Sequence, residues 1–210
     1  MSATSQRWKT WNQKIHIYVG LYFLVFIWLF SVSGLLLNHH WSFTEFWPQR
    51  RQAKVERTIV PPVGATDLER ARDLMRQLGI GGEIEWTATH ATPERFEFRV
   101  ARPGFNAEVS ADLAHRTATA QETRVNGWGV FRTLHTFTGV RLNAPTAERD
   151  WWLTKLWSFS MDAVCVGVVA LIATSLVLAY ERRERRLASA VALAAGVLTC
   201  GFFVFGINWL

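Results

Sequence analysis

The sequence predicts an α+β membrane protein, in which three transmembrane helices carry one small polar domain between the first helix and the second. Two observations support this fold class. The apolar residues of the 210-residue chain gather in three blocks, and each block has about the 20 residues that span a bilayer core. Most of the charge falls in the polar stretch between the first two blocks. The blocks are residues 15–37, 158–180 and 187–207.

The first block is expected to be a retained helix rather than a signal peptide. It is longer than a typical signal-peptide apolar region, and it runs into Asn38, His39, His40 and Trp41 instead of a small-residue cleavage site. The two cysteines, Cys165 and Cys200, fall inside the later blocks, so no disulfide framework is expected in the polar domain.

Basic residues beside the blocks predict the orientation. Arg7, Lys9 and Lys14 precede the first block without an acid, and residues 181–186 read Glu-Arg-Arg-Glu-Arg-Arg between the second and third blocks. Such residues mark cytoplasmic segments. Residues 1–14 and 181–186 are therefore expected in the cytoplasm and residues 38–150 outside it. Much of the formal charge of +6 comes from these flanks, where basic residues meet anionic lipid headgroups. The sequence shows no nucleic-acid-binding module.

The polar stretch predicts a compact domain over about residues 55–125. Thr66 and Glu69 form a capping box, and apolar residues at helical spacing extend the helix to Leu78, before Gly79. Alternating segments then predict strands with one buried and one wet face, so the acidic residues on them are expected to be solvated. One helix on a small antiparallel sheet results. The predicted strands are residues 83–89, 95–101 and 106–113.

At this point the chain resembles the PepSY-associated transmembrane family, in which a small extracytoplasmic PepSY domain is inserted between helices of the bacterial inner membrane. The resemblance rests on several motifs in the same order: Ile-His-Ile-Tyr-Val-Gly at 15–20, Ser-Gly-Leu-Leu-Leu-Asn-His at 33–39, Val-Ser-Ala-Asp at 109–112, Phe-Arg-Thr-Leu-His-Thr at 131–136, and the segment from Met161 and Asp162 to Gly167.

The resemblance implies a link to iron and siderophore uptake. Larger members include ferric-siderophore reductases whose transmembrane histidines hold haem. Three spans are expected here instead of four, which would leave fewer helices to supply axial ligands.

The depths of the histidines restrict which of them can share a cofactor. His16 and His39 are 23 residues apart, which is about 35 Å along a helix. His39 or His40, at the outer end of the first span, lies on the same side as His135, and such a pair would suit one b-type haem. His16 has no later histidine as a partner on the inner side. A second subunit would have to supply one, or His16 only caps its helix.

Other interpretations of these residues stay open. His39 and His40 also suit the membrane interface, and a copper or zinc ion is a competing ligand. Asp162, about one turn inside the second span, would orient His135 or another imidazole. Alternatively it caps a helix that starts late and pairs with Arg141, Arg149 or Lys155. His90 and His115 are expected to be exposed turn residues.

Two functions follow as hypotheses. The first is a membrane electron-transfer or reductase-like component that binds one haem and acts in iron acquisition. The second is a non-catalytic, membrane-anchored module that binds or restrains an extracytoplasmic partner such as a peptidase, because an exposed sheet edge can accept a strand. Besides the lipid membrane, a protein partner or a second copy is expected. No hydrolase motif is present.

Overall fold

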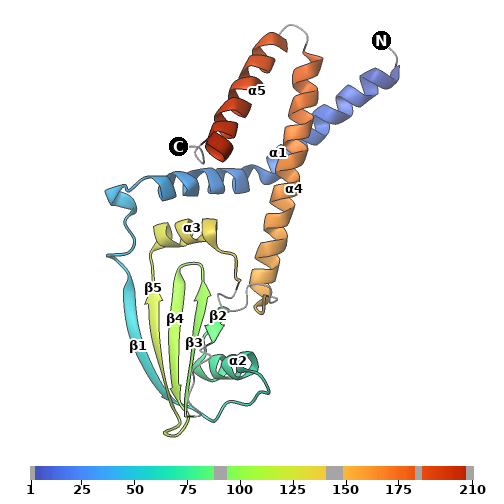
Figure 1. Ribbon diagram of the computed structural model, residues 1–210. Helices are drawn as coiled ribbons and strands as arrows, with labels where there is room; N and C mark the ends of the chain where they lie inside the picture. Colours follow the sequence, from blue (N-terminus) through green and yellow to red (C-terminus); the bar gives the residue numbers. More distant parts are fainter. Residues whose placement is uncertain (1–2, 88–93, 141–148, 183–185, 207–210) are drawn as a thin grey trace. The chain divides into compact units, whose positions relative to one another are not determined.

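The computed structural model describes the following residues: 3–87, 94–140, 149–182 and 186–206. They form two parts. The helical part comprises residues 1–25 and 162–210, and the sheet part comprises residues 26–161. Helix α1 (Ala3–Asn38) and helix α4 (Trp152–Glu181) each contribute to both parts. Figure 1 labels the elements in chain order.

Within the described residues, three helices are long and apolar enough to cross a membrane: residues 6–38, 152–181 and 186–206. This confirms the three expected membrane helices. The third is α5 (Arg186–Gly201), continued by a π-helical turn, Phe202–Gly206. At 1.5 Å rise per residue, α1 and α4 are about 54 Å and about 45 Å long, more than a bilayer core of about 30 Å. Ile207, Asn208 and Trp209 lie outside the described residues.

In the helical part, α1 and α4 pack through glycines. A Cβ atom added to Gly167 of α4 would lie 2.2 Å from the ring of Phe23, and Gly20 of α1 faces Leu171. Glycines at such crossings let helix backbones approach closely. By contrast, none of the most apolar stretch of α5 is buried, so its apolar surface is available to lipid or to another chain.

The sheet part contains a five-stranded antiparallel sheet between the first and second membrane helices, in the order β1-β5-β4-β3-β2. Strands β2 to β5 follow one another as neighbours, and β1 is added beyond β5, so β1 and β2 are the edges (Figure 1). The strands are β1 (Arg51–Thr58), β2 (Glu83–Thr87), β3 (Arg95–Arg102), β4 (Phe105–Asp112) and β5 (Thr117–Arg124).

One face of the sheet forms the domain core. On β3 the alternate residues Phe96, Phe98 and Val100 are buried, and the register places Val109 and then Ala120 beside Phe98. Helix α2 (Asp67–Leu78) belongs to the same core. The α2 residues that join it are Ala71, Leu74 and Leu78. The expected helix on an antiparallel sheet is therefore confirmed.

Helix α2 begins and ends as its sequence indicates. The Thr66 side chain accepts a bond from the Glu69 backbone N–H, and the Glu69 side chain accepts from the Thr66 N–H, which completes the predicted capping box. At the other end Gly79 adopts φ 71°, a left-handed conformation that glycine accommodates without a Cβ penalty.

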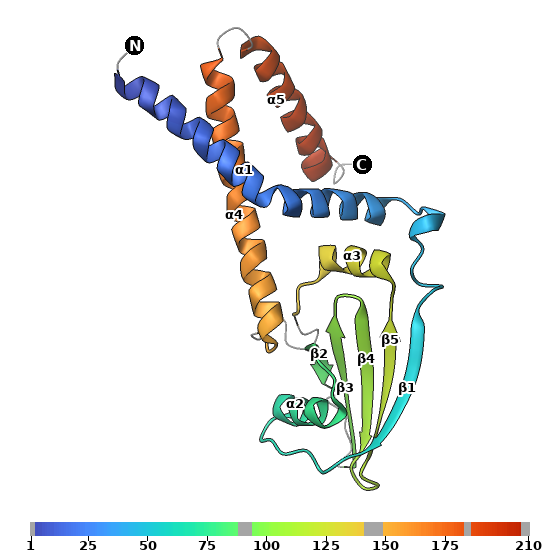
Figure 2. The same cartoon turned by 180° about the vertical axis from the view of Figure 1, so that it is seen from behind.

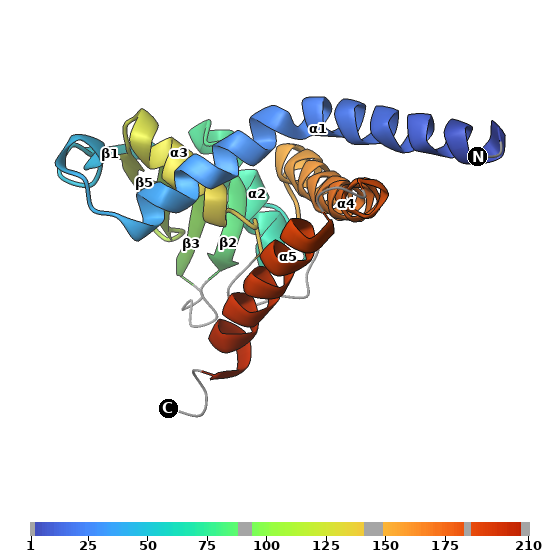
Figure 3. The same cartoon turned by 90° about the horizontal axis from the view of Figure 1, so that it is seen from above.

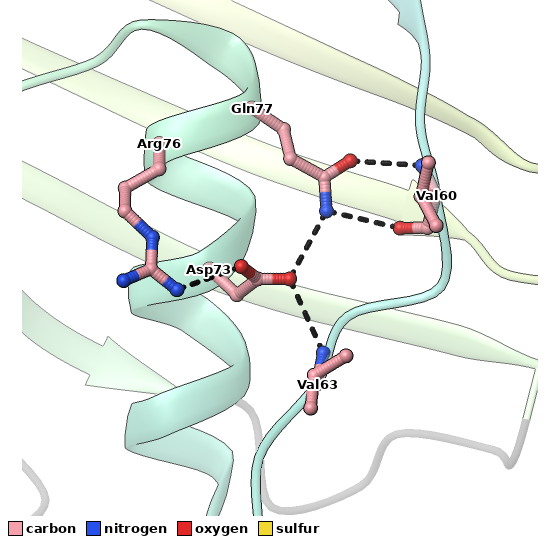
Figure 4. A network of polar contacts seen from close by, with 5 residues as sticks. All are labelled: Val60, Val63, Asp73, Arg76 and Gln77. Carbon is pink, nitrogen blue, oxygen red and sulfur yellow. Dashed lines mark hydrogen bonds and ion pairs between the residues drawn. The ribbon is translucent and has the colours of Figure 1, made fainter.

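Side chains of α2 also hold the segment that follows β1, as Figure 4 shows. The Gln77 amide accepts from the Val60 N–H at 2.8 Å and donates to the Val60 carbonyl at 3.1 Å. Asp73 accepts from Gln77, from the Val63 N–H and from Arg76. The Arg76 bond, followed by those from Val63 and Gln77, lowers the pKa of Asp73 below its ordinary value.

The turn between β4 and β5 contains a second short network. Asp112 accepts from the His115 backbone N–H and from His115 Nδ1, both at 2.9 Å. These bonds raise the pKa of His115 and lower that of Asp112. Arg116 follows with φ 54°. The expectation that His115 is an exposed turn residue is met, whereas His90 lies outside the described residues.

Two strands and one helix of this part go beyond the prediction, which had three strands. Strand β1 was not predicted because its residues do not alternate between apolar and polar. Both of its faces are exposed, with only Val55 half-buried. Strand β5 buries small residues, Ala118 and Ala120, that give little hydrophobic contrast. Helix α3 (Gly127–Thr136) contains two glycines, which disfavour helix in isolation.

Candidate functional site

Helix α3 carries His135 in its last turn, and its first turn is held by a cap and by close packing. Its first turn is capped by Asn126, whose side chain accepts from the Gly129 N–H at 3.1 Å. Gly129 lies so close to Val125 and Phe46 that an added Cβ would come within 2.4 Å and 2.8 Å of them. Glycine at this position therefore lets α3 sit tightly against the loop that follows α1.

In the sheet part, α3 lies between the turn joining β3 to β4 and the later stretch of α1. The Gly104 N–H of that turn donates to Thr133 Oγ1 at 3.2 Å. On the other side, the ring of Phe131 meets Trp28 of α1, with centroids 6.0 Å apart. Figure 2 shows α3 at this end of the sheet, and Figure 3 shows the later stretch of α1 running over it.

His135 is bonded to α1 through one defined atom. Its Nδ1 lies 2.7 Å from Ser33 Oγ, and its ring packs edge-on against Phe30, with centroids 5.4 Å apart. Ser33 is fully buried and its hydroxyl donates to the Phe30 carbonyl at 3.2 Å. With the Ser33 hydroxyl proton on that bond, it is the imidazole tautomer protonated at Nδ1 that donates to Ser33 Oγ. The lone pair of the imidazole is left on Nε2.

His39 and His40 follow the end of α1, and both are exposed. The ring of His39 stacks on Trp41 at 5.3 Å. His40 lines a hollow of 360 Å³ together with Phe46 and Arg132. In the part of the chain that the structure describes, no hydrogen bond or ring contact joins either residue to His135.

His16 belongs to the helical part and has a partner there. Its Nδ1 lies 2.9 Å from Thr174 Oγ1 of α4. The Thr174 hydroxyl also lies within hydrogen-bond distance of the Ala170 and Leu171 carbonyls of its own helix. With its proton shared there, the His16 tautomer protonated at Nδ1 donates to Thr174 Oγ1. The buried Asn12 side chain adds a bond to the Thr174 carbonyl at 3.2 Å. His16 thus repeats the arrangement of His135: Nδ1 is held by a hydroxyl and Nε2 keeps its lone pair.

Asp162 lies on α4 with an exposed side chain, and the described residues offer it no hydrogen bond or ion pair. Arg149, one of its expected partners, donates instead to the Thr138 carbonyl at 2.8 Å. Arg141, another, lies outside the described residues. The proposed bond between Asp162 and an imidazole stays a prediction.

One carboxylate of the sheet part was missed by sequence reasoning. Glu83 is 1% exposed and accepts from the backbone N–H groups of Asp150 at 2.6 Å and Trp151 at 3.0 Å. These N–H groups directly precede α4, whose positive dipole end favours a carboxylate. Arg72 of α2 pairs with the Asp150 side chain at the same place. The expectation that all acids on the strands are solvated is wrong at this position.

Of what a bis-imidazole haem site requires, the described residues show one part, an imidazole with its Nδ1 hydrogen-bonded. His135 has a lone pair on Nε2, and the bond at its Nδ1 is the kind of support that orients metal-binding histidines. The described residues do not place a second imidazole against it, and among them no group of three or more His, Cys, Asp or Glu side chains is arranged to hold a metal ion.

Compared with protein-family models, curated proteins and solved structures, the chain matches none of them.

Proposed function

We propose that the chain is a PepSY-type membrane protein that binds a b-type haem through His135 and transfers electrons in iron or siderophore acquisition. In this proposal the N-terminus is cytoplasmic and the sheet domain lies on the extracytoplasmic side of the bacterial inner membrane. The fold supports it, because a helix on an antiparallel sheet is inserted between the first and second of three membrane helices.

The observation that carries the proposal is the bond between His135 and Ser33. A haem ligand needs an imidazole with a free Nε2 lone pair and a fixed ring plane. The hydroxyl of Ser33 supplies the first condition through its bond to Nδ1, and the contact with Phe30 supplies the second. A bound haem would supply one-electron chemistry at its iron.

The second axial ligand would come from His39 or His40, after a movement of the exposed loop, or from another subunit. Another subunit would also supply a partner for His16, whose Nδ1 is likewise bonded to a hydroxyl. The chain has no histidine after His135 that could pair with it. The exposed apolar surface of α5 gives such a subunit a place to pack.

The test is a reduced-minus-oxidised absorption spectrum of the full chain, purified in detergent from cells supplied with haem. We expect a Soret band and an α band in the wild type. Haem content should fall to background in His135→Ala and persist in His115→Ala, a matched control in an exposed turn. A wild type without haem bands, or equal haem content in both variants, would overturn the proposal.

The open edge of the sheet favours a second candidate function, a non-catalytic module that binds an extracytoplasmic partner. Among the described residues, strand β1 pairs with β5 alone and is exposed along most of its length, so an extended segment of a partner can pair with its other side. This candidate predicts that removing residues 55–125 abolishes function in cells, whereas replacing His39, His40 and His135 together leaves function intact. The haem proposal predicts that the triple replacement abolishes function.

A further inference from the structure

Three arginines and one phenylalanine form a row across the sheet at its α3 end. The register places Arg51 of β1 opposite Arg124 of β5, Arg124 opposite Phe105 of β4, and Phe105 opposite Arg102 of β3. Residues opposite each other point to the same face, and neighbouring strands are about 4.8 Å apart. The arginine row therefore presents three guanidinium groups on four adjacent strands.

The row is held in place by its central ring. The Cζ atoms of Arg102 and Arg124 lie 4.6 Å and 4.8 Å from the centroid of Phe105. Stacking uses the flat face of a guanidinium and leaves its N–H donors, which lie in the plane, directed outward. Glu122 pairs with Arg124 at 3.0 Å, whereas Arg51 and Arg102 have no acidic partner among the described residues.

A bound anion would offset the repulsion between two arginines of the row. Like charges directly opposite each other on neighbouring strands are destabilising, and Arg51 faces Arg124 in this way. Two more arginines stack at the same end: Arg50 on Trp47, and Arg132 on Phe46. These two rings line a cavity of 290 Å³ together with Arg102 and Phe105. The end of the sheet is thus basic well beyond the row itself.

The location of the row indicates which anion it meets. It lies at the end of the sheet that carries α3 and the later stretch of α1 (Figures 1 and 2). Helix α1 is a membrane-span candidate, and Trp41 and Trp47, residues that favour the headgroup level, lie in the loop between α1 and β1. Guanidinium donors at the end of the sheet that carries this loop are complementary to phosphate groups of lipids.

We propose that the arginine row binds the phosphate of an anionic phospholipid, on the side of the membrane where the sheet part lies. The site is separate from His135, so the proposal does not depend on haem. The lipid is recognised by its negative phosphodiester and by its position in the bilayer surface.

The experiment compares the full chain with two double variants of equal charge loss. In the row variant, Arg102→Gln with Arg124→Gln removes the two arginines that stack on Phe105. In the control, Arg57→Gln with Arg95→Gln removes two arginines near the opposite end of the sheet. Each protein, in a neutral detergent, is titrated with phosphatidylglycerol in mixed micelles with phosphatidylcholine. Binding is followed by tryptophan fluorescence and by the thermal midpoint. Soluble glycerol phosphate serves as a parallel titrant.

We expect the row variant to bind phosphatidylglycerol roughly 30-fold more weakly than the wild type, from the usual contribution of two basic side chains at an anionic surface. The Arg57 and Arg95 control should bind as the wild type does. The thermal midpoint of the row variant without lipid reports that it is folded, and Arg102→Lys with Arg124→Lys should recover most of the binding. Equal affinity in the row variant and the control overturns the proposal. So does binding of glycerol phosphate as tight as that of the lipid, or no preference for phosphatidylglycerol over phosphatidylcholine.

Discussion

Replacement of Glu83 should release the start of α4 from the sheet domain. Its carboxylate is buried and accepts two backbone N–H groups. Hydrogen bonds to a charged group contribute about 1.5–3 kcal/mol each, and the helix dipole adds up to about 1 kcal/mol. Glu83→Ala leaves both N–H groups without their partner and should cost about 4 kcal/mol. Glu83→Gln keeps one acceptor oxygen and should cost about 2 kcal/mol.

Hydrogen exchange measured by mass spectrometry on the full chain in detergent tests this estimate. Amides in peptides spanning residues 149–156 should exchange roughly 30-fold faster in Glu83→Gln and several hundred-fold faster in Glu83→Ala, since about 1.4 kcal/mol is a factor of ten. Glu85→Gln is the matched control, because Glu85 is a neighbour on the same strand whose ion pair with Arg99 is partly exposed. Unchanged exchange in Glu83→Ala, or an equal change in the control, would refute the reasoning.

Three further predictions concern the sheet part. Gly139→Ala should lower the unfolding free energy by about 3 kcal/mol, because Gly139 has φ 63° and an added Cβ would lie 2.1 Å from the Thr154 side chain. Phe98→Ala should lower it by about 3–5 kcal/mol, the usual cost of emptying a fully buried phenylalanine site. The raised pKa of His115 means that its bond to Asp112 stabilises the fold fully below about pH 6.5 and is lost as the pH rises through the raised value. The wild type should therefore lose more stability than His115→Ala over this rise.

Each of the three has a control that the structure supplies. Gly127→Ala is the control for Gly139→Ala, since no atom lies within 4 Å of a Cβ added at position 127. Val55→Ala on the exposed strand β1 serves for Phe98 and should cost less than about 1 kcal/mol. For His115, only the difference between variant and wild type counts, because the two proteins share all their other histidines. Thermal and urea unfolding measure all three, and equal losses in variant and control would contradict the packing argument.

The predictability of each element followed the strength of its local signal. Helix α2 was predicted to its ends, since Thr66, Glu69 and Gly79 each act within one turn of the backbone. Strand β3 was predicted because its apolar residues alternate. Strand β1 was missed, because an edge strand exposed on both faces has no need of alternation. What fixes β1 is its pairing with β5, which lies about sixty residues later in the chain.

The candidate site was predictable only in its residue types. A histidine beside a membrane span indicated His135, yet its bond to Ser33 depends on how α3 packs against α1, a contact between residues 102 positions apart. The sequence does not indicate that Glu83 is buried. In residues 83–87, Glu-Ile-Glu-Trp-Thr, it takes a position that alternation predicts to be exposed. The structure buries both Glu83 and Ile84, and the register between β2 and β3 shifts just after Ile84. An irregular edge strand and a distant backbone segment together decide its role.

Helix α3 connects the sheet to helix α1. It is bonded to the β3–β4 turn through Thr133 and to α1 through His135, two residues apart on one short helix. Because Arg102 and Phe105 belong to the same turn as Gly104, α3 connects the strands of the arginine row to helix α1 through two hydrogen bonds, one at Thr133 and one at His135.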